Sequence, residues 1–502
     1  MKKAIMNMIL ASFLVLLGLT ACAPANSKTA MVMALSGNPS TLDPQATTET
    51  LTFQVTKSLY DTLLEPDAKG NLIPALAEAW SISDDQLAIS FRLRAGVKFH
   101  DGSDLTARDV KATIERLLDP KTASPSKAEF AVIQSIDTPE PLTVVLHLKN
   151  PASPLLTSLA SGWAAILSAD KIAAGFNFAT GEAGTGPFIL KSLEMDSRIV
   201  LERNPNYWQK GLPKLDELTL QVVAERTLRV QGMVSGQLDA MDLVNPEDIP
   251  ALTAKKNIAI QEDLSSLVMV VAINTSHDIL GKLAFRQALN YAVDKQKVID
   301  VAYGGGKIVG TFNDAANPYY ADFTTLFPFD PIKARDLVKA SGYSPNRVLD
   351  LVLPENFEPH VKAGQIYQEM FKAVGIETKI RLVDWSTWIN EVYGKAKYDL
   401  TVIGHTGKLD PDGRFQGYGR GGMYVRWTNP RAADLIDQAR VNPDTAKRRE
   451  MYREVQKEFA QDLPFVFVGT SKRIVAINQR LSGFVYTPNL DTYDFRQVEI
   501  GR

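Results

Sequence analysis

The stretch of sequence that decides the fold class reads VLDLVLPENFEPHVKAGQIYQEMFKAVGIETKIRLV from Val348 to Val383. Short apolar runs predict strands at 348–352 and 378–383, and apolar residues recur at helical spacing over 360–374. A strand, a helix and a second strand in that order indicate an α/β domain.

The same kind of alternation extends outward from this stretch. Strands are expected at 268–273 and 398–404, and helices at 282–302, 331–340 and 432–439. The N-terminal half is also mixed, with the expected strands at 30–35, 87–93, 143–148 and 217–223, a helix at 107–117, helical spacing over 50–64, and further mixed structure at 188–202. The predicted fold class is therefore α/β over the whole chain.

The N-terminus carries the pattern of an export signal. Lys2 and Lys3 precede an apolar run at 8–19, and the small residues before Cys22 complete a lipobox. The run is too short for a transmembrane helix, which needs about 20 residues. We expect residues 1–21 to be a lipoprotein signal peptide and Cys22 to carry the lipid that anchors the exported protein to a membrane. The competing interpretation is a buried N-terminal helix that ends in a chance cysteine.

Composition excludes several classes of function. The 55 basic and 57 acidic residues give a net charge of −2, which offers no basic surface for nucleic acid. The one cysteine leaves nothing for disulfides, and the five histidines are scattered along the chain. We expect no cofactor and no metal bound directly by the protein.

The segment 404–422 is the most unusual part of the chain. It contains seven glycines, two aspartates and three basic residues directly after a probable buried strand. A loop of this length in a compact domain is usually functional or disordered, and its aromatic and charged residues favour function.

Three features near this loop admit more than one interpretation. Gly417–Gly422 matches GxGxxG, but the residues after it, 423–427, look extended, whereas a dinucleotide site requires a helix there. His405, Asp410 and Asp412 are either metal ligands or turn formers. Trp385 and Trp388 are either core residues or the wall of a cleft, because tryptophan offers a large contact surface in both places.

A series of short segments carries a resemblance to a known family. In order along the chain they are Leu59–Leu63, Pro74–Trp80, Phe91–Gly102, Leu105–Val110, Gly184–Phe188, Arg203–Trp208, Ser235–Asp239 and Arg286–Asp294. In this order and spacing the chain resembles the solute-binding proteins of the peptide/nickel class (family 5) of ABC importers, and the resemblance covers the whole mature length.

The resemblance implies a type II periplasmic-binding-protein clamshell that closes on a solute and delivers it to ABC permease subunits. Lobe I would comprise 30–266 and 475–502, with an accessory domain at about 60–165, and lobe II would comprise 267–474. The protein would be a monomer that acts outside the cytoplasm. A solute that touches both lobes would favour the closed state.

The resemblance also suggests where the solute binds. Trp385 matches a tryptophan that lines the cleft of oligopeptide binders, and His405 falls where an aromatic residue is common. Peptide binders place an aspartate for the ligand's α-amino group shortly before the loop proline, where this chain has Gly407 or Lys408. The full set of candidate ligand-binding residues is Trp385, His405, Lys408, Asp410, Asp412, Arg414, Tyr418 and Asp43.

This departure makes ordinary peptide binding through a free α-amino group unexpected. An anionic or neutral polar solute, or a carboxylate-rich metal chelate, fits better beside Lys408 and Arg414. The leading hypothesis is a lipoprotein that imports a peptide or peptide-like solute. One alternative is a nickel or metal-chelate binder that uses Arg414 or Arg420. Another is a surface enzyme or adhesin on the same fold, although no nucleophile and base pair supports an enzyme.

Overall fold

The computed structural model describes residues 29–67, 70–313, 317–406, 408–487 and 492–501. The predicted signal peptide at 1–21, the lipidation site Cys22 and the loop position Gly407 lie outside the described residues. Within the described part of the chain, no helix is long and apolar enough to cross a membrane.

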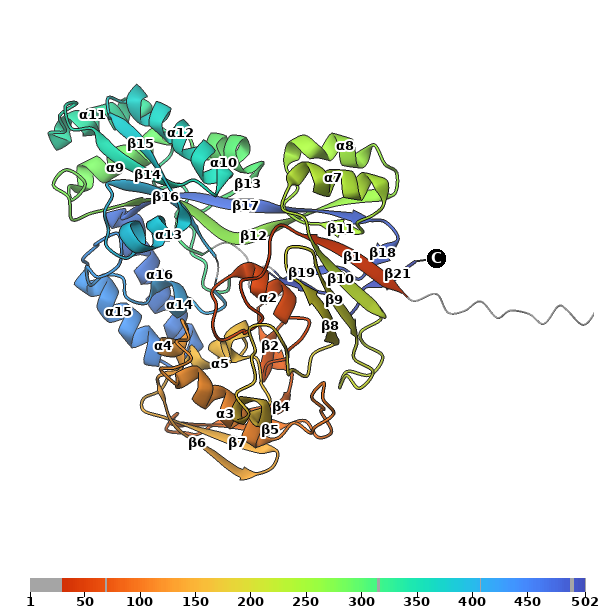
Figure 1. Cartoon of the computed structure of the whole chain (residues 1–502). Helices are drawn as coiled ribbons and strands as arrows, with labels where there is room; N and C mark the ends of the chain where they lie inside the picture. The colour runs from red at the N-terminus through yellow and green to blue at the C-terminus, as the bar shows by residue number, and fades with distance from the viewer. Residues whose placement is uncertain (1–28, 68–69, 314–316, 407, 488–491, 502) are drawn as a thin grey trace, which may run out of the picture.

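One sheet of eleven strands runs through the two larger parts of the molecule (Figure 1). Its order is β15-β14-β16-β12-β17-β11-β1-β10-β9-β8, and β13 pairs with β17. The strands are β1 Ala30–Leu35, β8 Phe188–Glu194, β9 Arg198–Arg203, β10 Glu217–Val222, β11 Ala240–Met241, β12 Ile258–Ile273, β13 Gly306–Ile308, β14 Leu349–Pro354, β15 Thr378–Val383, β16 Leu400–His405 and β17 Phe465–Asn478. β14 pairs in parallel with β15 and β16, as helical crossovers require.

The long strands β12 and β17 join the two parts. Ile258–Leu264 pairs with Lys472–Asn478, and after a register shift Val268–Ala272 pairs with Phe465–Thr470. The predicted lobe boundaries at 266/267 and 474/475 fall inside these two strands, and they stay a prediction.

A separate four-stranded antiparallel sheet, with order β4-β5-β7-β6, lies at the bottom of Figure 1. Its elements are β4 Ala77–Ile82, β5 Ala88–Leu93, β6 Ile133–Glu140 and β7 Thr143–Leu148, with helices α3 Ala107–Leu118, α4 Lys127–Phe130 and α5 Leu155–Ser158. It has its own apolar core, formed around side chains such as Phe91, Ile114 and Leu146. This unit, called the small domain below, lies in the range predicted for an accessory domain.

Helices cover the sheet in the C-terminal half. They are α9 Leu283–Ala292, α10 Lys295–Tyr303, α11 Pro331–Ser341, α12 Glu358–Ala373, α13 Trp385–Thr387, the π-helical η3 Trp388–Tyr393, α14 Asp412–Phe415, α15 Pro430–Val441 and α16 Thr445–Asp462. The single helix predicted at 282–302 is wrong, because the chain is extended at Val293 and a second helix starts after Asp294. The Asp294 carboxylate accepts a hydrogen bond from Lys297 N at 3.1 Å and caps that helix.

The helical spacing at 50–64 also overstates the structure, since α2 covers only Thr50–Thr56. After it, Ser58 O and Leu59 O accept hydrogen bonds from Phe188 N and Gly186 N, both at 3.0 Å. A Cβ at Gly186 would lie 2.4 Å from Leu59 C, so this close backbone pairing requires glycine. Tertiary contacts have replaced the end of the predicted helix.

The remaining elements complete the part that contains the N-terminus. They are β2 Leu64–Pro66, β3 Leu72–Pro74, η1 Gly162–Ala164, α6 Ala169–Ala173, α7 Arg226–Ser235, η2 Pro246–Asp248, α8 Ile249–Thr253, β18 Leu481–Ser482, β19 Val485–Thr487, β20 Thr492–Asp494 and β21 Glu499–Ile500.

Candidate functional site

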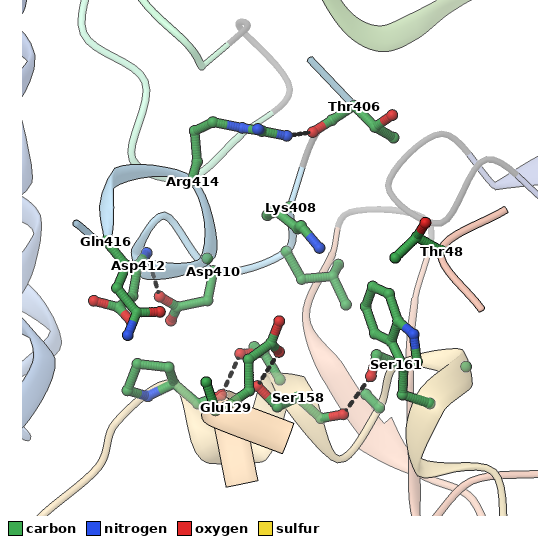
Figure 2. Close-up of a pocket in the computed structure, with 18 of the residues that line it drawn as sticks. Thr48, Glu129, Ser158, Ser161, Thr406, Lys408, Asp410, Asp412, Arg414 and Gln416 are labelled. Atoms are coloured by element: carbon green, nitrogen blue, oxygen red, sulfur yellow. Dashed lines mark hydrogen bonds between the residues drawn. The ribbon is translucent and has the colours of Figure 1, made fainter. Parts of the chain in front are cut away.

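A cavity of about 950 Å³ lies between the small domain and the part of the molecule that carries β16 (Figure 2). Its walls come from residues 48–62, 128–132, 149–165, 385–393, 403–416 and 437–441, together with Thr492. Segments far apart in the sequence therefore form one site. Its size is in the range of small-molecule and short-peptide pockets.

A tryptophan pair forms one wall of this cavity. The rings of Trp385 and Trp388 stack with centroids 5.1 Å apart and an interplanar angle of 3°. Trp388 is buried and donates a hydrogen bond from Nε1 to Thr401 Oγ1 at 3.0 Å, whereas Trp385 is 40% exposed. Both interpretations from the sequence therefore apply, with Trp388 as a core residue and Trp385 as the exposed face of the wall.

His405 ends β16 and is buried at the cavity wall. Its Nδ1 lies 3.1 Å from Arg414 Nη1, which can only donate, so Nδ1 accepts and the proton sits on Nε2. Nε2 then donates to the hydroxyl of Tyr424 at 2.7 Å. Burial, together with the charge of Arg414, holds the pKa of His405 well below its ordinary value, so this imidazole is neutral.

Arg414, on α14, brings a positive charge to the same wall. Its guanidinium lies 5.7 Å from the ring centroid of Phe312 and also donates to the carbonyl of Thr406. Among the described residues, no carboxylate lies within ion-pair distance of it. Burial lowers the pKa of Arg414, but an arginine keeps its proton in proteins.

The two aspartates of the loop are already paired. Arg448 donates to both oxygens of Asp410, at 2.5 and 2.6 Å, and this ion pair is buried. Arg440 Nε lies 3.1 Å from Asp412 Oδ1, which also accepts from the hydroxyl of Tyr452 at 3.2 Å. Burial raises the pKa of Asp412, and Arg440 opposes that shift. These contacts oppose a metal site at His405, Asp410 and Asp412, and the described residues contain no other group of His, Cys, Asp and Glu placed to hold a metal.

Lys408 lies on the same loop, and its charge has no such partner. Its Nζ is 4.6 Å from the ring centroid of Trp163, on η1, which packs against the core of the small domain, and no described carboxylate lies within 4.0 Å of it. Burial lowers the pKa of Lys408, and the negative charge of the Glu129 carboxylate opposes this shift. Glu129, on α4, accepts a hydrogen bond from Ser158 Oγ at 3.0 Å.

Glu129, Ser158 and Trp163 all line the cavity, and reasoning from the sequence did not identify them. No local motif marks them, because their position depends on how the small domain packs against the loop after β16.

Two predicted ligand-binding residues, Tyr418 and Asp43, do not line this cavity, so the cavity gives their assignment no support and it stays a prediction. Tyr418 is 2% exposed and packs against Phe459 in the core. Asp43 is buried and binds Arg116 through both of its oxygens.

Two further expectations about the loop need correction. Arg420, proposed for a chelate, pairs with Asp437 and is not part of the cavity wall. Residues 423–427 form turns rather than an extended segment, and no helix starts directly after Gly422, so the GxGxxG match has no dinucleotide context.

Comparison with known proteins gives a consistent result. The profile of bacterial extracellular solute-binding proteins, family 5 (middle region), matches residues 71–423. Glutathione-binding protein GsiB of Escherichia coli is 28% identical over 473 residues, which cover 91% of this chain and 92% of GsiB.

Two solved structures are similar over almost the whole length. The ABC transporter substrate-binding protein CtaP of Listeria monocytogenes has a TM-score of 0.87 at 22% identity, over 95% of this chain and 100% of CtaP. The binding protein AgaA of A. tumefaciens, in complex with agropinic acid, has a TM-score of 0.81 at 27% identity, over 94% and 99%.

These matches confirm the predicted α/β fold of the type II periplasmic-binding-protein class. The profile covers more than half of the chain, and it spans seven of the eight segments that first indicated the resemblance, all except Leu59–Leu63. The chain therefore belongs to the bacterial extracellular solute-binding proteins of family 5, the binding components of ABC importers.

Proposed function

We propose that this protein captures a peptide or peptide-like solute in the 950 Å³ cavity and delivers it to the permease subunits of an ABC importer. The observation that carries the proposal is the cavity itself, which combines an aromatic wall with unpaired charges and lies between the small domain and the part that carries β16. The names of GsiB and AgaA, which bind glutathione and agropinic acid, support a small, carboxylate-bearing solute. The protein would act as a monomer, without a cofactor and without catalysis.

The charges of the loop favour a carboxylate over an ammonium group beside β16. Asp410 and Asp412 are held by Arg448 and Arg440, so neither is free to anchor an α-amino group. Lys408 and Arg414 remain without a carboxylate partner among the described residues. A carboxylate of the solute would supply the missing charge, and a charged hydrogen bond of this kind is strong when water is excluded.

Direct contacts between the small domain and α15 suggest that the structure represents a closed arrangement. Ser153 N and Oγ donate to Arg440 O and Asn442 O, at 3.1 and 2.5 Å. A solute that touches both walls would shift the population toward this arrangement. Small-angle scattering should show a smaller radius of gyration on saturation, and no change from a demonstrably open state would contradict the mechanism.

Calorimetry provides the direct test of solute class. The panel would contain di- to pentapeptides, glutathione, their N-acetylated and C-amidated forms, and nickel chelates, after native mass spectrometry has identified any co-purified solute. We expect saturable binding of at least one carboxylate-bearing, peptide-like solute. Binding of chelates alone would favour the metal-chelate alternative, and hydrolysis of any of these solutes would support an enzyme.

We also propose that the protein is anchored through a lipid on Cys22 and faces the periplasm or the exterior. The support is the sequence of the first 22 residues. Cys22→Ser should leave the protein unprocessed or release it from membranes, as shown by fractionation and intact mass. An unchanged mature mass and unchanged membrane association would contradict the proposed anchor.

A further inference from the structure

Two opposite charges face the cavity from different parts of the molecule. Lys408 comes from the loop after β16, and Glu129 comes from α4 of the small domain, on the other side of the cavity in Figure 2. Both residues line the cavity, and they form no ion pair within 4.0 Å of each other. The negative charge of Glu129 opposes the lowering of the Lys408 pKa by burial.

The other carboxylates that line the cavity are already neutralised. Asp410, Asp412 and Asp437 each form an ion pair with an arginine. Among the described lining residues, Glu129 is the carboxylate that has no cation within 4.0 Å, and its one hydrogen bond is from the neutral Ser158.

Neighbouring aromatic residues position Lys408. The indole of Trp163 lies beneath the ammonium group, donates from Nε1 to Thr47 O at 2.7 Å, and meets Phe53 edge-to-face at 5.2 Å. A cation over an indole keeps its N–H groups free to donate to a third group. Lys408 and Glu129 therefore present a donor and an acceptor to whatever lies between them.

We propose that Lys408 and Glu129 form a subsite for a zwitterionic head in which an ammonium and a carboxylate are attached to the same carbon. The carboxylate of the solute binds Lys408, and its ammonium group binds Glu129. This inference rests on the proposed function, and it names the chemical class of the solute's end group. It also places the ammonium site on α4 rather than on the loop, where Lys408 and Arg414 disfavour a cation.

Such a head would connect the small domain to the loop after β16. Each protein charge would gain its partner only when the two walls are close, so binding of the head would favour closure. A solute with only one of the two charges would leave the other protein group desolvated and unpaired, which costs affinity.

A calorimetric cycle tests this subsite. The probes are γ-glutamylalanine, which carries both charges on one carbon, its N-acetyl form, its α-amide form, and alanylalanine as an ordinary dipeptide. The proteins are the parent, Glu129→Gln, Lys408→Met, Lys408→Arg, and the control Lys121→Met, which removes an exposed cation of the small domain that does not line the cavity. Thermal melts establish that each variant is folded.

In the parent, N-acetylation and amidation should each weaken binding of γ-glutamylalanine by roughly tenfold or more. Glu129→Gln should remove the effect of N-acetylation, and Lys408→Met should remove the effect of amidation. Lys408→Arg should retain sensitivity to amidation, and Lys121→Met should behave like the parent.

The outcomes separate the two proposals. Suppose that solutes of the wider peptide panel bind and close the protein. The zwitterion subsite is then wrong if the variants discriminate among the probes as the parent does, or if alanylalanine binds as tightly as γ-glutamylalanine. If no peptide-like solute binds and scattering never changes, the proposed function itself is wrong. A direct Lys408–Glu129 ion pair that persists with the solute bound would also overturn the subsite.

Discussion

The loop after β16 divides into two parts that look alike in sequence and differ in position. The first part, 405–416, lines the cavity with charged and polar groups. The second part, 417–427, packs into the core through Tyr418, Tyr424 and Trp427, each no more than 3% exposed.

Both parts contain glycines and aromatic residues, but their glycines have different surroundings. Gly417, Gly419 and Gly421 have positive φ angles of 84°, 81° and 70° and turn the chain inside the protein. Gly413, in the first part, lies at the cavity wall. Glycine and aromatic content alone therefore does not distinguish a binding loop from a tightly folded turn.

The largest expected effect comes from the ion pair that anchors the first part. Asp410→Asn would leave the buried charge of Arg448 without its partner, which should lower the free energy of unfolding by about 3–5 kcal/mol. Urea unfolding measures this loss. The control is Asp437→Asn, whose ion pair with Arg420 is exposed and which should cost less than about 1 kcal/mol. Equal losses of stability in the two variants would contradict the distinction between the buried ion pair of Asp410 and the exposed ion pair of Asp437.

The next largest effect is a loss of stability from changes in the second part of the loop, 417–427. Gly419→Ala would force an alanine to a φ of 81° and place its Cβ 2.7 Å from Asn429 O. We expect a loss of about 1–3 kcal/mol in the free energy of unfolding. Gly422→Ala, where a Cβ meets nothing within 4 Å, should change stability by less than about 0.5 kcal/mol. Solute affinity measured well below the melting temperature of each variant should stay unchanged, since neither glycine lines the cavity.

Trp385 should contribute to affinity rather than to stability. Trp385→Ala removes an exposed ring at the cavity wall and should weaken binding of solutes with an apolar group by roughly tenfold. Calorimetry measures this change beside Tyr418→Ala, which should destabilise the fold and leave the affinity of the folded fraction intact. The assignment of Trp385 to the cavity would be refuted by the opposite pattern.

The smallest effect is a pH dependence of solute affinity that arises from Lys408, whose neighbouring charges are Glu129 and Arg414. Burial lowers the pKa of free Lys408, and a bound carboxylate raises it again. Affinity should therefore be highest below the pKa of the free protein and should fall as pH rises through the pKa of the complex, by at most about tenfold per pH unit. In Lys408→Arg the charge does not titrate, so binding of the same solute should keep only the part of the pH dependence that arises from the solute's own groups. Identical pH profiles in both proteins would exclude Lys408 as the titrating group.

The spacing of apolar residues predicted the bounds of an element well where the element's own residues alone determine its structure. Strand β7 and strand β15 have the predicted bounds, and helix α3 ends one residue beyond its prediction. The same reasoning was wrong for the end of α2 and for the break between α9 and α10. There, backbone pairing with residues 184–188 and a capping aspartate override helical periodicity.

The candidate site was predictable only in part. Trp385, His405, Lys408, Asp410, Asp412 and Arg414 do line the cavity, because they lie within one loop and one helix start next to a buried strand. The ion pairs of Asp410 and Asp412 were not predictable, since their partners Arg448 and Arg440 come from helices further along the chain. Tyr418 and Asp43 lie away from the cavity wall, because a polar or aromatic residue in a turn can face either the cavity or the core.

The sequence by itself determined the α/β class, the family and the position of the unusual loop, because these depend on periodicity and on ordered local segments. Only the tertiary structure decided which charges stay unpaired. Whether a carboxylate is neutralised depends on residues that are distant in the chain, as with Asp410 and Arg448. The same holds for Lys408 and Glu129, which are 279 positions apart in the chain, and which meet at one cavity because the small domain packs against the end of β16.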